Sequence, residues 1–244
     1  MKRITLLSTF IFAAMMGFAQ NEETRSLSSF NYISAHEGID VYFKSGSKEE
    51  ARISARNIDL RDVLTEVEGG KLKIHLDGNK HNNVDVTVWV TYKKLNGVSA
   101  SSAADIRGEN RVITDGDFRV SASSAGDVEV DVKANNLDIS ASSAGDIEIK
   151  VEVKDIDGGV SSAGGIEIEG TARSVDITAS SSGDFEGFDL VCEEADVNAS
   201  SGGSIEITVK EQLDARASSG GSIKYKGNPR MDVSTSSGGS VKKY

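Results

Sequence analysis

A short phrase of small residues occurs eight times between residues 101 and 240 of this 244-residue chain and limits what the chain can fold into. Each copy has two adjacent serines, two more small residues, a position that we call the anchor, and then alternating apolar and polar residues. Self-similarity at a fixed period of this length is typical of solenoids, in which each repeat is one supersecondary unit. The anchors are Asp105, Asp127, Asp146, Gly165, Asp184, Ser204, Ser222 and Ser240, with spacings of 22, 19, 19, 19, 20, 18 and 18 residues.

Each repeat has the pattern of two short strands separated by a corner. In Leu137-Asp138-Ile139 and in Ile147-Glu148-Ile149, apolar residues alternate with charged ones, which predicts strands with one buried face. A single pair of strands cannot bury its apolar face, but stacking each repeat on the next buries both faces. We therefore predict an all-β fold, a parallel β-solenoid (β-helix) of about eight coils of 18–22 residues over residues 95–244. An antiparallel β-sandwich is the alternative, but it does not explain residue types that return at a fixed period.

The residue before the anchor is glycine in seven of the eight repeats, and Ala104 in the first. Glycine adopts positive φ at little cost, which suits a tight corner. We therefore expect residues such as Gly145 to turn the chain through positive φ.

Residues 20–94 lack the repeated phrase but still alternate as strands. Gly69-Gly70 predicts a hairpin turn between residues 63–67 and 71–76. An open solenoid end leaves apolar side chains and backbone groups without partners, so we expect residues 20–94 to cap the first coil. At the other end, Lys242, Lys243 and Tyr244 put charge where another chain would add a strand.

The first 19 residues have the pattern of a secretory signal peptide. Lys2 and Arg3 precede an apolar run, and Ala19 completes a small-x-small cleavage site. The run is short for a membrane anchor, which is the alternative. No cysteine lies near the cleavage point, so we do not expect a lipid anchor. The predicted organisation is therefore a signal peptide (1–19), a capping β region (20–94) and the solenoid (95–244).

Composition narrows the classes of partner. The chain has a formal net charge of −11, which becomes −13 without the signal peptide. Nucleic acid and anionic lipid would be repelled, so cations, basic proteins and neutral sugars remain as partners. The single Cys192 cannot form an internal disulfide, and we expect it to be buried.

These residues together resemble a known family. The segments FNYISAHEGIDVYFKSG, VEGGKLKIHL and VDVTVWVTYKKLNGVSASSAADI, followed by the Ser-Gly repeats, are similar to the autotransporter-adhesin family with a head-GIN domain, found in exported proteins of Gram-negative bacteria. The resemblance covers nearly all of the mature chain. It implies a β-helix-like fold, an exported protein and a role in cell adhesion, without catalytic residues.

We find no pattern that predicts catalysis, a metal site or a cofactor. The histidines are His36, His75 and His81, all outside the repeats, so no repeat serine has a base nearby in the sequence. No two histidines have zinc-ligand spacing. Phe185 and Tyr225 occupy positions of the alternation that point inward, so we expect both side chains to lie in the core. We therefore predict a protein that is not an enzyme and that has no cofactor.

The acidic residues of the repeats occupy two fixed positions and form two predicted ladders. Two places after the anchor, glutamates follow one another and are flanked by Arg107 at one end and Lys224 and Lys242 at the other. Like charges facing each other on neighbouring strands destabilise a sheet unless water, salt or bound cations screen them. One interpretation is a solvated face that keeps the sheets soluble; the other is weak binding of divalent cations or of a cationic partner. The candidate binding residues are Glu129, Glu148, Glu167, Glu186 and Glu206 in one ladder, and Asp138, Asp157, Asp176, Asp196, Asp214 and Asp232 in the other.

The sequence favours a non-enzymatic exported interaction protein of the cell envelope, adhesin-like, with an unknown protein or glycan as partner. Its alternatives are a carbohydrate-active β-helix enzyme and a passive structural spacer. The periplasm, the outer-membrane surface and the cell exterior all remain open as locations.

Overall fold

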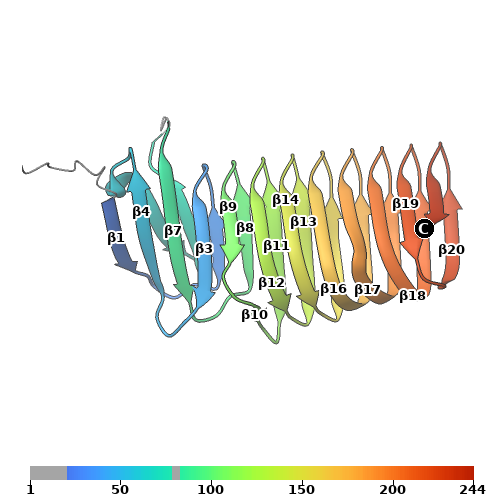
Figure 1. The fold of residues 1–244 in the computed structure, drawn as a ribbon, viewed down its shortest axis with the longest axis horizontal. Coiled ribbons are helices and arrows are strands. Elements are labelled where there is room, and N and C mark those ends of the chain that lie inside the picture. The colour runs from blue at the N-terminus through green and yellow to red at the C-terminus, as the bar shows by residue number, and fades with distance from the viewer. Residues whose placement is uncertain (1–20, 79–82) are drawn as a thin grey trace, which may run out of the picture.

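The computed structural model describes residues 21–78 and 83–244, and it forms an elongated rod of stacked strands (Figure 1). The predicted signal peptide and its cleavage point, and also His81, lie outside the described residues. No helix in the described part of the chain has the length and apolar character to cross a membrane. The N-terminal elements are β1 (Asn21–Ser26), β2 (Tyr32–Ala35), β3 (Asp40–Ser45), β4 (Glu50–Arg56), the 3-10 helix η1 (Leu60–Asp62), β5 (Val63–Glu68), β6 (Lys71–Leu76) and β7 (Asp85–Tyr92).

The repeats form a parallel β-solenoid of about eight coils, as predicted. Equivalent residues of successive repeats lie side by side: Asp127 pairs with Asp146, and Asp146 pairs with Gly165. This parallel register excludes the antiparallel sandwich. The strands of the repeats are β8 (Gly97–Ser101), β9 (Asp105–Gly108), β10 (Val112–Ile113), β11 (Asp117–Ser123), β12 (Asp127–Lys133), β13 (Asn136–Ser142), β14 (Asp146–Glu152), β15 (Asp155–Val160), β16 (Gly165–Ala179), β17 (Asp184–Ala199), β18 (Ser204–Ala217), β19 (Ser222–Lys226), β20 (Arg230–Thr235) and β21 (Ser240–Lys243).

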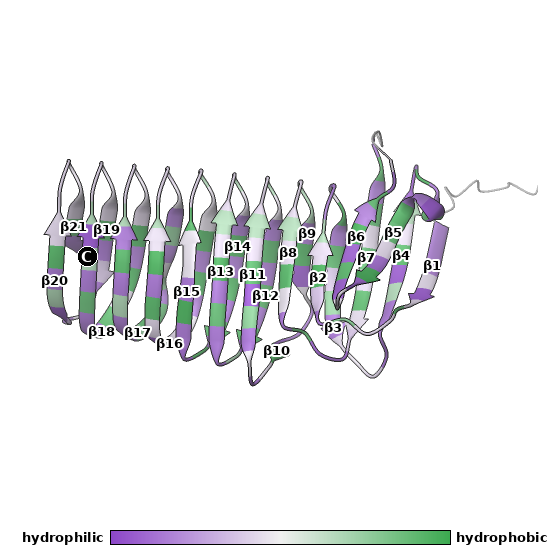
Figure 2. Ribbon diagram, turned by 180° about the vertical axis from the view of Figure 1, so that it is seen from behind, coloured by the Kyte–Doolittle hydropathy of each residue, from purple (hydrophilic) through white to green (hydrophobic). Residues whose placement is uncertain are grey.

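The coils build two sheets that enclose one apolar core. The first sheet contains β8, β11, β13 and β15; the second contains β9, β12 and β14; and the long strands β16, β17 and β18 bend from the second sheet into the first. Ile147 and Ile166, which follow their anchors, are each 2% exposed. Figure 2 shows the resulting alternation of hydrophobic and hydrophilic bands along each strand. The core is therefore a set of aliphatic ladders running along the rod.

The N-terminal region contributes a coil of its own to the stack. β2 pairs in parallel with β8, and β3 pairs in parallel with β9. On their other side β2 and β3 pair with β6 and β7, which come later in the sequence. Beyond them, antiparallel pairings of β4 with β7, β5 with β6 and β1 with β4 end the parallel pattern, so β1 and β4 lie at the far end of the rod (Figure 1). The predicted hairpin at Gly69-Gly70 is confirmed by the β5–β6 pairing.

The corner glycines have a different role from the expected one. The residues with positive φ in the third repeat are Ser143, at 52°, and Ala144, at 58°, and Gly145 is not among them. A Cβ atom on Gly145 would instead lie 2.5 Å from the backbone carbon of Ala122 in the preceding coil. The expectation of positive φ at Gly145 is therefore wrong: glycine stands there because two coils approach too closely for any side chain.

Candidate functional site

The predicted glutamate ladder forms a continuous row on the second sheet. Successive members are register partners on β12, β14, β16, β17 and β18. At one end Arg107 Nε lies 3.7 Å from Glu129 Oε2, and at the other Lys224 Nζ lies 2.7 Å from Glu206 Oε1. Among the described residues, no ion pair involves the three central members. We call the five residues Glu129, Glu148, Glu167, Glu186 and Glu206 the glutamate row.

The predicted aspartate ladder forms a second row, on the first sheet. Its members are register partners from β13 to β20. Arg119 forms an ion pair of 2.8 Å with Asp138, and Arg216 forms one with Asp196. Burial, Asp196 and Asp157 raise the pKa of Asp176 above its usual value, while Arg216 opposes the shift. We call Asp138, Asp157, Asp176, Asp196, Asp214 and Asp232 the aspartate row; two of its six members form ion pairs with arginine.

The centre of the glutamate row lies in a hollow of about 230 Å³. A second hollow of about 440 Å³ lies beside it, between the row and the corners. Two features of the chain produce these hollows. Gly165 has no side chain at its anchor position, and β17 contains three residues between Gly187 and Val191 that have no register partner in β18. We call the two hollows the acidic groove; both are lined by Glu148, Glu167 and Glu186, and the first also by Glu206, Phe188, Asp189 and the ion pair of Lys150 with Glu169.

Phe188 forms one wall of the acidic groove, and Tyr244 packs against it. Phe188 lies in the bulge of β17, and its ring centroid is 4.9 Å from that of Tyr244. Lys226 Nζ lies 4.2 Å from the Phe188 centroid and 5.2 Å from the Tyr244 centroid, within the range of a cation–π contact. The repeat pattern did not reveal this wall. The 20-residue spacing of the unit that contains Phe188, beside spacings of 19 and 18, was the only signal of extra residues there.

The expected core positions of the repeats are confirmed. Phe185 is 0% exposed, and Tyr225 is partly buried and packs against the core. Cys192 is buried, as predicted, and burial raises the pKa of its thiol to about 12. This thiol therefore remains protonated and inert at neutral pH.

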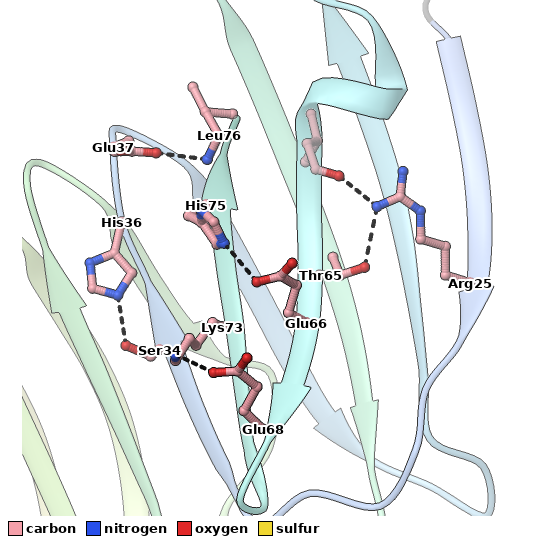
Figure 3. Close-up of polar contacts among 11 residues, drawn as sticks. Arg25, Ser34, His36, Glu37, Thr65, Glu66, Glu68, Lys73, His75 and Leu76 are labelled. Carbon is pink, nitrogen blue, oxygen red and sulfur yellow. Dashed lines mark hydrogen bonds and ion pairs between the residues drawn. The ribbon is translucent and has the colours of Figure 1, made fainter. Parts of the chain in front are cut away.

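The structure brings one histidine to the repeats, which the sequence order concealed. His36 Nε2 lies 2.9 Å from Ser34 Oγ (Figure 3). His36 Nδ1 lies 2.6 Å from Ser101 Oγ of the first repeat. Ser99 donates a hydrogen bond of 2.9 Å to Ser34. These contacts arise because β2 stacks directly on β8.

The Ser101–His36 pair lacks the surroundings of a nucleophile in acyl transfer. The other imidazole nitrogen meets a serine where a triad would have a carboxylate. The nearby amides of Gly38 and Ala104 donate to the carbonyls of Ser102 and Ser101, so they are not free to stabilise an oxyanion. The pair therefore fits a structural network that joins the N-terminal coil to the first repeat.

His36 predicts a dependence of stability on pH. Burial, followed by weaker contributions from His75, Lys71 and Lys73, lowers the pKa of His36 below its usual value of 6.5, although Glu37 opposes the shift. As the pH falls, the unfolded chain therefore binds a proton at His36 before the folded chain does. The stability that neutral His36 contributes is complete above the pKa of the unfolded state and is lost as the pH falls through the pKa of the folded state. We expect the loss of unfolding free energy between about pH 7 and about pH 5 to be smaller in His36→Gln than in the unchanged protein, by urea titration. Equal losses in both proteins would contradict this assignment.

The glutamate row predicts different effects for two similar substitutions. Burial, Asp184, Glu167 and Glu206 raise the pKa of Glu186, so its ionised form disfavours the folded state at neutral pH, and this penalty disappears as the pH falls through the folded pKa. We expect Glu186→Gln to raise the unfolding free energy by about 0.5 kcal/mol at neutral pH and low salt, and added salt to reduce the gain. Glu129→Gln is the matched control: it removes a partner of Arg107 and should bring no gain. Equal shifts in urea midpoint for both variants would refute the repulsion.

In the described residues, no group of three or more histidine, cysteine, aspartate or glutamate side chains has a metal-binding arrangement. The carboxylates of the two rows lie in single files along the sheets, rather than around a point. What the arrangement offers chemically is an elongated negative surface with an aromatic wall.

Comparison with known proteins places the chain in one family. The model of the family "Putative auto-transporter adhesin, head GIN domain" matches residues 29–229. No protein with a curated description matches the chain. Three solved structures share the fold over nearly the whole chain. They are a putative adhesin from Parabacteroides merdae (20% identity, 92% of this chain and 95% of that one, TM-score 0.83), a putative adhesin from Parabacteroides distasonis (21%, 93% and 97%, TM-score 0.85) and a putative lipid binding protein from the same species (25%, 92% and 97%, TM-score 0.82).

The family match spans β2 to β19, and it leaves out β1 at the N-terminal end and β20 and β21 of the last coil. The resemblance inferred from the sequence is thus confirmed, and the chain belongs to the family of putative auto-transporter adhesins with a head GIN domain.

Proposed function

We propose that this protein is a non-enzymatic, adhesin-like interaction protein, exported to the bacterial cell envelope, that binds a cationic partner along the acidic groove. Family membership supports the adhesin-like role. One observation supports the place of binding: Glu148, Glu167 and Glu186 stand in register in a hollow, and no ion pair satisfies them within the described residues.

The groove favours a polymer with repeated positive charge over a compact ligand. The carboxylates lie one per coil, and neighbouring strands in a sheet are about 4.8 Å apart, so the negative charge extends along the rod. Phe188 adds an apolar surface next to the charge. A basic protein segment or a glycan with amino sugars presents the matching chemistry, with charge complementarity that sets specificity and association rate.

The test uses the purified protein and two matched triple variants. Glu148→Gln, Glu167→Gln and Glu186→Gln together remove the charge of the groove; Asp157→Asn, Asp176→Asn and Asp214→Asn remove the same charge from the other sheet. We expect binding to a lysine-rich peptide, and to any hit among amino-sugar glycans on a glycan array, to weaken by roughly tenfold in the glutamate variant only. Equal weakening in both variants would show that net charge alone acts, and turnover of a polysaccharide would overturn the non-enzymatic assignment.

A further inference from the structure

The last coil of the rod presents an open edge. β20 pairs only with β18, and β21 pairs only with β19, so within the described residues the outer edge of each strand has no partner. Figure 1 places β20 at the end of the rod opposite β1. Backbone N–H and C=O groups on such an edge are available to another strand.

The interior of the solenoid continues up to this edge. Met231 and Val233 are register partners of Leu213 and Ala215, and they occupy the same inward ladders. Leu213 and Ala215 are at most 1% exposed, but Met231 is 41% exposed and Val233 is 44% exposed. The opposite end of the rod differs, because antiparallel strands cover its core: Ile53 in β4 and Val63 in β5 are both 0% exposed.

We propose that the open edge docks the same edge of a second copy, and that the two rods join end to end about a two-fold axis parallel to the strands. β20 runs toward the corner at residues 236–239, and β21 runs away from it. Rotation about that axis places corner beside corner and brings β20 antiparallel to β21 of the partner subunit. The interface is isologous, so it closes as a dimer and does not propagate as a filament.

The pleat and the apolar side chains together restrict the register of this pairing. Val233 and Val241 both belong to inward ladders, because their register partners Ala215 and Ile223 are buried. Matching inward positions allows registers that differ by two residues, and the register that sets Val233 opposite Val241 of the partner subunit pairs two apolar side chains. The neighbouring outward positions then set Asp232 opposite Lys242 of the partner subunit, and the symmetry makes this pair twice.

Charge selects this arrangement over the other two-fold pairing. An axis perpendicular to the sheets would lay β20 on β20 and β21 on β21 of the partner subunit, and Lys242 would then lie directly opposite or diagonally across from Lys242 of the partner subunit. Like charges directly opposite each other destabilise a strand pair, whereas opposite charges contribute favourably. Lys242 and Lys243, which oppose the addition of an unrelated strand, thus favour the pairing of β20 with β21 of the partner subunit. We call this arrangement the crossed pairing. The two sheets of a coil are only about 10 Å apart, so the end of the rod offers a small contact area. This area is smaller than a standard interface, and we expect a weak dimer.

The experiment is sedimentation velocity with small-angle scattering on the full purified chain over a wide concentration range. We expect a monomer–dimer equilibrium, with a maximum dimension that nearly doubles in the dimer. Lys242→Glu places two carboxylates together and should abolish the dimer, and so should Asp232→Lys. The double variant Asp232→Lys with Lys242→Asp should restore it, while Lys154→Glu, which lies away from the edge between β14 and β15, should leave it unchanged.

Each result decides the proposal. A monomer at all concentrations would overturn it, and so would a compact dimer or one that survives Lys242→Glu. Failure of the charge-reversed double variant to dimerise would overturn the crossed pairing. Circular dichroism of every variant verifies that the fold persists, and none of these residues lies in the acidic groove, so the outcome is independent of the proposed binding function.

Discussion

Gly145→Ala is expected to lower the unfolding free energy by about 3 kcal/mol, although it adds a single methyl group at a corner. The new Cβ would lie 2.5 Å from the backbone of Ala122 and Ser123, and backbone atoms cannot turn aside as a side chain can. The two coils would have to separate, which would weaken the hydrogen bond of 3.1 Å from the amide of Asp146 to the Gly126 carbonyl. The midpoint and slope of urea unfolding measure the loss.

The neighbouring residue provides a control of opposite sign. Ala144 has a φ of 58°, in the left-handed region that disfavours residues with a Cβ. Ala144→Gly should therefore keep the stability or raise it by up to about 1 kcal/mol. The chain contains this substitution naturally, since Gly202, Gly220 and Gly238 take the equivalent position in the last three repeats with φ between 75° and 80°. If both variants lost stability to the same extent, the contact across coils would not be the reason for Gly145.

Phe185→Ala is expected to have the largest effect of any single truncation considered, about 3–5 kcal/mol. Phe185 is fully buried and stands in an inward ladder between Ile166 and Ile205, where the neighbouring coils hold its cavity open. Because each coil of a solenoid contacts only its neighbours, a defect in the middle of the stack weakens coupling between the two halves. Hydrogen exchange should then show faster exchange in the coils that follow β17 than in β8 and β11.

Phe188→Ala is the matched control, three residues along the same strand. Phe188 is only partly buried and contacts Tyr244 and Lys226 at the wall of the groove. Its truncation should reduce the unfolding free energy by no more than about 1 kcal/mol. A similar loss in the two variants, measured by thermal unfolding, would contradict the assignment of Phe185 to the core ladder.

Much of the candidate site could be predicted because a fixed period fixes register. Once the repeats stack in parallel, Glu148 must lie beside Glu167, and Asp157 beside Asp176. The groove could not be predicted in the same way, because it depends on departures from the period. Gly165 leaves an anchor position empty, and the bulge that carries Phe188 raises a wall against Tyr244, which is 56 residues away in the sequence.

The sequence by itself determined the parallel solenoid, the inward ladders and the two acidic rows, because alternation of period two and a repeat near 19 residues leave one way to bury the aliphatic side chains. Only the tertiary structure decided that β2 and β3 insert between later strands, that His36 meets Ser101, and that Gly145 serves close approach rather than positive φ. These three features depend on distances between backbones of different coils. A local pattern of residue types carries no information about such distances until the coils are stacked.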